Sequence, residues 1–240
     1  MDNTSKLLEL TMDRLEFHTT EEGRKKMLHF GIPNDLAFGL SNPLVKSISR
    51  ETGRNHELAL KLWNTGFHEA QLMASLIGEP GKLTPYQMDH WITTINSWAV
   101  CDGVCSNLFR KTSFAYEKAI EWTYRGPEYE KRAGFSMMAV LAIHDKNGSD
   151  KRLLPFFGRM QDEAGDKRNF VYKGINWALR QCGKRSLFLH QHAIRTAKKI
   201  GRQDSRTAKW VAADALRELN SDAVVERLMN KERRKMEKDI

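Results

Sequence analysis

The stretch Gly-Ile-Asn-Trp-Ala-Leu-Arg at residues 174–180 decides the predicted fold, because two similar stretches flank it at nearly equal spacing. Gly-Phe-Ser-Met-Met-Ala-Val at 134–140 starts 40 residues earlier, and Ala-Asp-Ala-Leu-Arg-Glu-Leu at 213–219 starts 39 residues later. Each is rich in small residues and follows a more polar helical segment. One such helix pair cannot bury its apolar face alone, so we expect successive pairs to stack against one another.

The rest of the chain also has helical rather than strand-like spacing. Leu8, Met12 and Leu15 recur at i, i+4 and i+7, which is the apolar stripe of an amphipathic helix. Glycine, proline and asparagine clusters cut the chain into pieces of one or two helices, at residues 31–34, 41–43, 78–81, 126–127, 146–148 and 183–184. We therefore predict an all-α, HEAT-like helical-repeat solenoid with a concave, basic groove. It would form a single domain over residues 1–240, with residues 231–240 as a frayed helix end.

Composition excludes several classes of protein. The 240 residues are 40% hydrophobic and 29% charged, which excludes a collagen, a disordered tail and a membrane protein. Three cysteines are too few for a disulfide framework. The chain opens on polar residues, and its apolar runs are far shorter than the roughly 20 residues that span a bilayer. We expect a cytoplasmic monomer, or a nuclear protein in a eukaryote.

The positive charge is concentrated in one part of the sequence. The net charge is +9, and residues 151–200 alone carry 12 basic and 3 acidic side chains, so the rest of the chain sums to zero. A confined basic field attracts a polyanion, and phosphate contacts there would release counterions. A solvated cationic helix face is the alternative explanation.

Most motifs of enzyme chemistry are missing from the sequence. It has no glycine-rich nucleotide loop and no Gly-x-Ser-x-Gly elbow. His68-Glu69 begins like a zinc-protease helix, but Leu72 stands where the second histidine would be. Cys101 and Cys105 lie one helical turn apart, and two cysteines without a nearby Cys/His pair are more often packed thiols than metal ligands. We expect no metal and no cofactor.

One helical segment carries a candidate catalytic group. Trp98 and Asp102 are four residues apart, so they share a helix face, whereas Val100, Val104 and Leu108 form a second stripe that can face the core. An aspartate inside an otherwise apolar helix costs desolvation unless it is paired or functional. The alternative is an Asp102 that pairs with an arginine or caps a helix, beside an ordinary core tryptophan.

Five stretches follow one another in an order typical of a known repair family: residues 37–43, Trp63 with 68–71, 97–102, 130–133 and 170–180. Together they resemble the AlkD-type family of DNA alkylation repair glycosylases, which are built from HEAT-like repeats. The resemblance implies a catalytic set consisting of Asp102, Trp98, Arg132 and Trp177. It also implies DNA-binding residues, namely Lys173, Arg180, Lys184, Arg168 and Phe30. The chain departs from the family pattern at Ala99, where many relatives have Asp, and at Gln71, where Arg is usual.

The resemblance implies that the protein excises N3- or N7-alkylated purines from double-stranded DNA by hydrolysing the N-glycosidic bond, without a base-flipping pocket. An alkylated purine already carries positive charge, so its departure needs no strong general acid. Asp102 would stabilise the oxocarbenium-like sugar and position water. Trp98 and Trp177 would contact the cationic lesion and its sugar. Arg132 would hold a backbone phosphate and keep Asp102 in place.

Three of these residues could have purely structural roles, and two other functions remain open for the chain. Arg132 can be a structural ion-pair partner, Trp177 a core aromatic, and Arg180 the cover of a helix face. A non-catalytic helical-repeat module that binds nucleic acid would also explain the basic window and the departures at Ala99 and Gln71. A protein-binding scaffold would explain the repeats alone.

Overall fold

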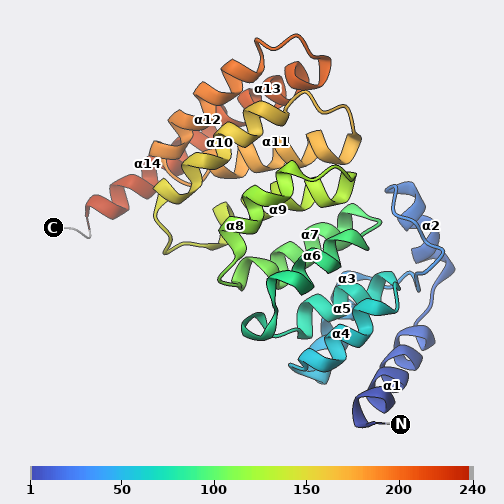
Figure 1. Ribbon diagram of the computed structural model, residues 1–240. Helices are drawn as coiled ribbons and strands as arrows, with labels where there is room; N and C mark the ends of the chain where they lie inside the picture. Colours follow the sequence, from blue (N-terminus) through green and yellow to red (C-terminus); the bar gives the residue numbers. More distant parts are fainter. Residues whose placement is uncertain (1, 238–240) are drawn as a thin grey trace. The chain divides into compact units, whose positions relative to one another are not determined.

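The computed structural model describes residues 2–237, and within them all regular secondary structure is helical (Figure 1). These residues form fourteen α-helices and four short 3-10 helices. The predicted all-α class is therefore confirmed. The chain divides into two compact units, Met1–Phe114 and Ala115–Ile240, and each is described by itself. A single domain over residues 1–240 stays a prediction.

The first unit contains seven α-helices, and side-chain caps fix where several of them begin. Thr20 accepts a hydrogen bond from the Gly23 amide at 3.1 Å and caps the second helix. It belongs to the run Thr-Thr-Glu-Glu at residues 19–22, which is a typical helix start. Thr84 and Gln87 form a reciprocal capping box at the sixth helix. The helices are α1 (Asn3–Phe17), α2 (Glu21–His29), α3 (Asn42–Thr52), α4 (His56–Asn64), α5 (His68–Ile77), α6 (Pro85–Thr93) and α7 (Trp98–Asn107), with η1 (Pro80–Lys82) and η2 (Phe109–Lys111) between or after them.

The core of the first unit is built around an aromatic stack. The rings of Trp63 on α4 and Trp91 on α6 lie 4.1 Å apart and nearly parallel, and the Trp63 indole donates to the Thr94 hydroxyl at 2.9 Å. Offset aromatic stacking of this kind adds about 0.5–1.5 kcal/mol beyond area burial. Both indoles are fully buried, so this stack fixes α4 against α6.

The second unit contains the predicted repeat. Its α-helices are α8 (Ala115–Glu121), α9 (Glu128–His144), α10 (Leu154–Glu163), α11 (Asn169–Gly183), α12 (Leu187–Ile200), α13 (Arg206–Leu219) and α14 (Asp222–Met236), with η3 (Trp122–Tyr124) and η4 (Asp150–Leu153). The three similar stretches fall in α9, α11 and α13, and the helices that precede them are α8, α10 and α12.

The three repeat helices pack side by side and run parallel (Figure 1). At the start of α9 and α11, the Phe170 amide donates to the Glu128 carboxylate at 3.0 Å. Just past the end of α11, Arg185 donates to the Ala142 carbonyl near the end of α9 at 3.2 Å. The Tyr172 and Trp210 rings meet edge to face at 5.2 Å and join the first turns of α11 and α13. Stacked parallel helices of this kind are what the near-40-residue period predicts.

The C-terminal helix extends further than expected. α14 continues to Met236, so residues 231–236 are helical, and residues 238–240 of the expected frayed end lie outside the described residues. Within the described part of the chain, each helix is too short or too polar to span a bilayer.

Candidate active site

Trp98 and Asp102 lie on one face of α7, as their spacing predicts. Ser97 caps this helix by accepting the Val100 amide at 3.3 Å, so Trp98 is the first helical residue. Asp102 follows one turn later and is half-buried. The opposite stripe is fully buried as predicted, with Val100 and Val104 among its members. The core contacts of that stripe fix the rotation of α7, and with it the side of the helix that carries Trp98 and Asp102.

Trp98 is fixed by a second element, the end of α2. Its indole N–H donates to the carbonyl oxygen of Phe30 at 3.0 Å. The Phe30 ring itself is 61% exposed. The structure thus brings together two residues that the sequence assigned to catalysis and to DNA binding. The segment that holds the Trp98 indole thus carries an exposed aromatic ring, on which a nucleobase can stack.

A buried carboxylate holds the loop on which α2 rests. Glu69 on α5 is completely buried and accepts the backbone amides of Phe38, Gly39 and Leu40 at 2.9, 2.8 and 3.0 Å. A Cβ on Gly23 would lie 1.8 Å from the Gly39 carbonyl oxygen, so only glycine permits α2 to sit this close to the loop. The sequence did not assign Glu69 this role, although an acidic residue in an apolar helix is a signal of a buried partner.

Arg132 on α9 has a structural contact with the next repeat. Its side chain is almost buried, with 6% of the residue exposed, and it donates to the carbonyl of Phe170 at 2.6 Å. Its guanidinium also lies 6.0 Å from the centre of the Phe170 ring. A Cβ on Gly174 would come within 3.8 Å of this guanidinium, so the small residue of α11 leaves room for it. The arginine therefore ties α9 to the first turn of α11, and its predicted catalytic role stays a prediction.

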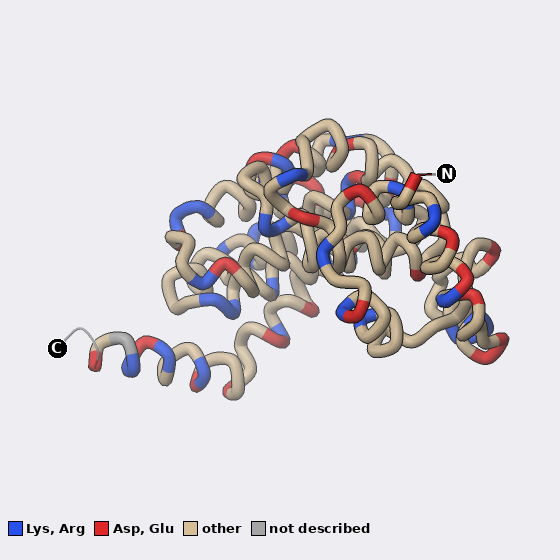
Figure 2. The backbone as a smooth tube through the Cα atoms, turned by 90° about the horizontal axis from the view of Figure 1, so that it is seen from below, with Lys and Arg blue, Asp and Glu red and all other residues tan. Residues whose placement is uncertain are grey.

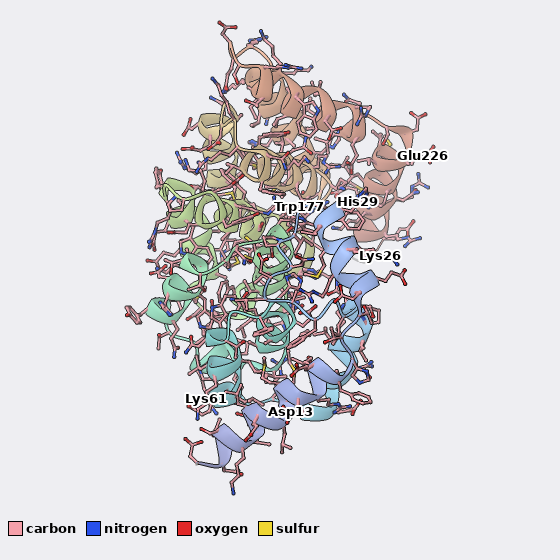
Figure 3. All side chains as sticks on the ribbon, turned by 90° about the vertical axis from the view of Figure 1, so that its right-hand side faces the viewer. Asp13, Lys26, His29, Lys61, Trp177 and Glu226 are labelled. Carbon is pink, nitrogen blue, oxygen red and sulfur yellow. The ribbon has the colours of Figure 1, made fainter. Side chains whose placement is uncertain are left out.

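Trp177 is half-buried on α11 (Figure 3). Lys173 and Gln181 lie one helical turn before and after it. The side-chain oxygen of Gln181 accepts two hydrogen bonds when the amide is turned toward its donors. They come from the Trp177 indole N–H at 3.3 Å and the Lys184 ammonium at 3.1 Å. The indole is therefore held at its polar end, as Trp98 is held by Phe30. Its half-buried state leaves part of the ring accessible to a ligand.

Two of the predicted DNA-binding residues are already paired with carboxylates. Arg180 and Lys184 both form hydrogen-bonded ion pairs with Glu218 on α13, and Arg180 also lies 3.9 Å from Asp214. Burial disfavours ionisation of Glu218, but hydrogen bonds from Lys184 and Arg180 outweigh it and hold the pKa of this carboxyl below its usual range. A DNA phosphate would have to compete with Glu218 for these two side chains.

The other two basic residues of the prediction differ in their surroundings. Arg168 caps α11, pairs with Asp166 at 2.5 Å and donates to the Gly126 carbonyl at the same distance. The hydrogen bonds that Arg168 donates to the Asp166 carboxylate raise the pKa of the arginine. Lys173 is exposed on α11, and no described carboxylate pairs with it. Lys173 is therefore the member of the set most available to a phosphate.

Half of the twelve cations of the 151–200 window are also available. Within residues 2–237, six of them are exposed and lack a carboxylate partner, namely Lys151, Lys167, Lys173, Arg195, Lys198 and Lys199. The remaining six pair with acidic residues, and for three of them, Arg180, Lys184 and Arg185, that residue lies at least 34 residues away in the sequence. The charge count of the window therefore overstates the field that a polyanion would meet.

The three cysteines are buried, and none of them forms a disulfide bond within the described residues. Burial raises the pKa of Cys182 to about 12, which leaves this thiol protonated and unreactive at neutral pH. Cys101 and Cys105 flank Asp102 on α7 and lie in its packed stripe. Among residues 2–237, no three His, Cys, Asp or Glu side chains are grouped so as to hold a metal ion.

The candidate catalytic residues are divided between the two units. Trp98, Asp102 and Phe30 belong to the first, and Arg132 and Trp177 to the second. In the first unit, Trp98 and Asp102 share a face of α7. In the second unit, Arg132 and Trp177 lie on the packed helices α9 and α11. The convergence of the two groups on a common surface stays a prediction.

Comparisons with known proteins agree with this fold. A family model described as "DNA alkylation repair enzyme" matches residues 11–219. The structure is similar to a solved protein described as belonging to "a new family of proteins related to the HEAT-like repeat DNA glycosylases with affinity for branched DNA structures". The TM-score is 0.73 at 21% identity, over 88% of this chain and 94% of that one, which confirms the HEAT-like fold. No curated protein sequence matches the chain. Since the family model covers most of its length, the chain belongs to the DNA alkylation repair enzyme family.

Proposed function

We propose that this protein is a DNA glycosylase that removes alkylated, cationic purines from double-stranded DNA. The observation that carries the proposal is the arrangement on α7, where Asp102 lies one turn beyond a Trp98 that the Phe30 carbonyl holds in place. An aromatic surface beside a carboxylate suits a cationic base attached to a sugar that becomes cationic in the transition state.

The reaction follows from the charge of the lesion. The glycosidic bond between C1′ of the deoxyribose and N9 of the alkylated purine breaks. Its electron pair stays with the purine, which leaves as a neutral base. Positive charge passes to the sugar, as in glycoside hydrolysis generally. Asp102 stabilises that charge and accepts a proton from the water that attacks C1′, so the products are a free base and an abasic site.

The aromatic residues and the cations hold the substrate. Trp98 and Trp177 are both anchored through their indole N–H groups, so their rings need little ordering when a lesion arrives. A contact of each ring with a cationic base is worth about 0.5–2 kcal/mol. Lys173 binds a backbone phosphate and carries no sequence information, which suits an enzyme that searches for damage.

The test uses a duplex with one 7-methylguanine and a matched undamaged duplex. We expect release of 7-methylguanine and an abasic site in the first only. Asp102→Asn should slow release by roughly 100- to 1000-fold while still binding the duplex. Asp13→Asn, which changes an exposed carboxylate on α1, should release the base at the wild-type rate. The absence of release by the wild-type protein, or undiminished release by Asp102→Asn, contradicts the proposal.

A second candidate function is binding of DNA junctions without base release. The solved relative is described as having affinity for branched DNA, and the exposed cations of the second unit, such as Lys167 and Lys199, are available to phosphates. A three-way junction that competes better than a linear duplex, together with no release from any alkylated duplex, would favour this function over excision.

A further inference from the structure

A large open cleft lies beside α14 in the second unit. Its volume is about 1890 Å³. One wall is a face of α14, and the floor is made by the loop after α9, the end of α11 and the start of α12. We call it the α14 cleft. None of the residues assigned to catalysis lines it.

The lining of the α14 cleft is net cationic. Seven of its side chains are basic and four are acidic, which leaves a charge of +3. One of the acidic residues is Asp150, whose carboxylate accepts hydrogen bonds from Arg185 and Ser186. Two of the others, Glu226 and Glu232, lie on α14, and Glu237 follows it; along α14, charges of both signs alternate toward the C-terminus (Figure 2). A concave surface with excess positive charge concentrates anions.

The basic groups are held at both sides of the cleft. Arg227 and Lys231 on α14 donate to the carbonyls of Lys184 and Arg185 at 3.4 and 2.6 Å, so they fix α14 to the end of α11. A neutral carbonyl does not cancel the positive charge of Arg227 or Lys231. Lys151, which lines the cleft from η4, is exposed and lacks a carboxylate partner among the described residues.

Two more cations extend this charge along the cleft. Lys146 lies in the loop after α9 and Arg234 near the end of α14, and both are exposed without a carboxylate partner in the described part of the chain. Cations on facing walls can bind successive phosphates of one strand.

An aromatic ring is exposed inside the cationic lining. Phe188 on α12 is 44% exposed, and its ring meets His192 edge to face at 4.9 Å. Ile143 adds a second exposed apolar group. A large apolar side chain left in water between lysines and arginines suits a ligand that has both a flat apolar face and a negative backbone.

The α14 cleft adjoins the part of α11 that holds Trp177. Gln181 and Lys184 line it, and Gln181 accepts the indole N–H of Trp177. A strand that follows α11 from Lys173 past Trp177 would therefore enter the α14 cleft at the end of the helix.

We propose that the α14 cleft is a second nucleic-acid site, which binds an unpaired DNA strand. Phosphates contact Lys146, Lys151, Arg227, Lys231 and Arg234, and one base stacks on Phe188. A base within a duplex offers its edges but not its face, so stacking on Phe188 selects single-stranded DNA. This site goes beyond the proposed lesion chemistry and would exist even if the protein had none.

The experiment measures fluorescence anisotropy of the full-length protein with a labelled oligothymidine of about 12 nucleotides, within the range that one single-strand module covers. Phe188→Ala should weaken binding about tenfold, and Phe188→Trp should restore it, because stacking needs an aromatic ring. Lys151→Gln with Arg234→Gln should lower the slope of log affinity against log salt by about 1.4. The matched control, Arg195→Gln with Lys198→Gln, removes two exposed cations of α12 that do not line the cleft, and it should leave the slope unchanged.

Three results would overturn this site: wild-type affinity in Phe188→Ala, an equal loss in the α12 control, or equal competition by polyglutamate, which would indicate an acidic peptide as the ligand. Failure of this site is separable from failure of the proposed function. Asp102→Asn should keep oligothymidine binding, and Lys151→Gln with Arg234→Gln should still release 7-methylguanine from a short, fully paired duplex.

Discussion

The indole N–H of Trp98 donates to the carbonyl oxygen of Phe30 at 3.0 Å, which joins the first residue of α7 to the end of α2 across 68 residues of sequence. This hydrogen bond sets the orientation of the ring that stands one turn from Asp102. It also explains why a phenylalanine at position 98 would not suffice, because the Phe30 carbonyl needs a donor and the indole supplies its N–H.

Trp98→Phe should slow base release more than it lowers stability. The variant keeps an aromatic ring but loses the bond to Phe30, which is worth about 0.5–1.5 kcal/mol, so single-turnover release should fall up to about tenfold. Trp63→Phe is the matched control, because it loses an indole hydrogen bond to Thr94 in the core. That control should lower the free energy of unfolding and leave the release rate unchanged. Equal release by Trp98→Phe and wild type would remove the positioning role of the Phe30 contact.

Glu69→Gln should strongly destabilise the first unit. The carboxylate accepts three backbone amides in a completely buried site, and an amide side chain would turn an NH₂ group toward at least one donor. The free energy of unfolding in urea should fall by about 2–4 kcal/mol. Glu57→Gln, an exposed carboxylate on α4, should change it by less than about 0.5 kcal/mol. A loss no larger than that of Glu57→Gln would show that the loop at residues 38–40 does not need Glu69.

Glu218→Gln should increase DNA affinity. Removing this carboxylate frees Arg180 and Lys184, which can then contact phosphates, so the slope of log affinity against log salt should steepen by roughly 1–2 for duplex DNA. Glu117→Gln on α8 removes an exposed charge of the same unit without releasing either cation, and it should have a smaller effect on the slope. Equal slopes in the two variants would indicate that Arg180 and Lys184 face away from bound DNA.

Stability should fall as the solution becomes mildly acidic. Burial lowers the pKa of both His56 and His68 in the folded protein, although nearby glutamates partly oppose this. The unfolded chain therefore binds protons first, so the contribution of each histidine is complete above about pH 6.5 and is lost as the pH falls through the lowered values. Urea unfolding should show a loss of up to about 1.4 kcal/mol per pH unit per histidine below that point. A His56→Gln, His68→Gln variant with the wild-type pH slope would contradict this assignment.

The fold could be read from the sequence because its cause is local and periodic. The stretches at residues 134, 174 and 213 became α9, α11 and α13, and the stripe of Val100, Val104 and Leu108 became the buried side of α7. Small residues and apolar spacing act on their own helix, so they can be recognised without knowing which segments meet.

The partners of the site residues could not be read in the same way. Glu69 meets a loop about 30 residues earlier, and Glu218 meets Lys184 from 34 residues away. A count of charges along a window includes the cations of α11 but omits the carboxylate that α13 places beside them. Arg132 shows the same limit, since its contact with the Phe170 carbonyl depends on how two repeats stack.

The most direct test of the central claim is the single-turnover rate of 7-methylguanine release by wild type, Asp102→Asn and Asp13→Asn, measured on one duplex with all the DNA bound. If Asp102 stabilises the cationic sugar, Asp102→Asn should be slower by roughly 100- to 1000-fold at unchanged duplex affinity, and Asp13→Asn should match wild type. Release by Asp102→Asn at the wild-type rate would contradict the account.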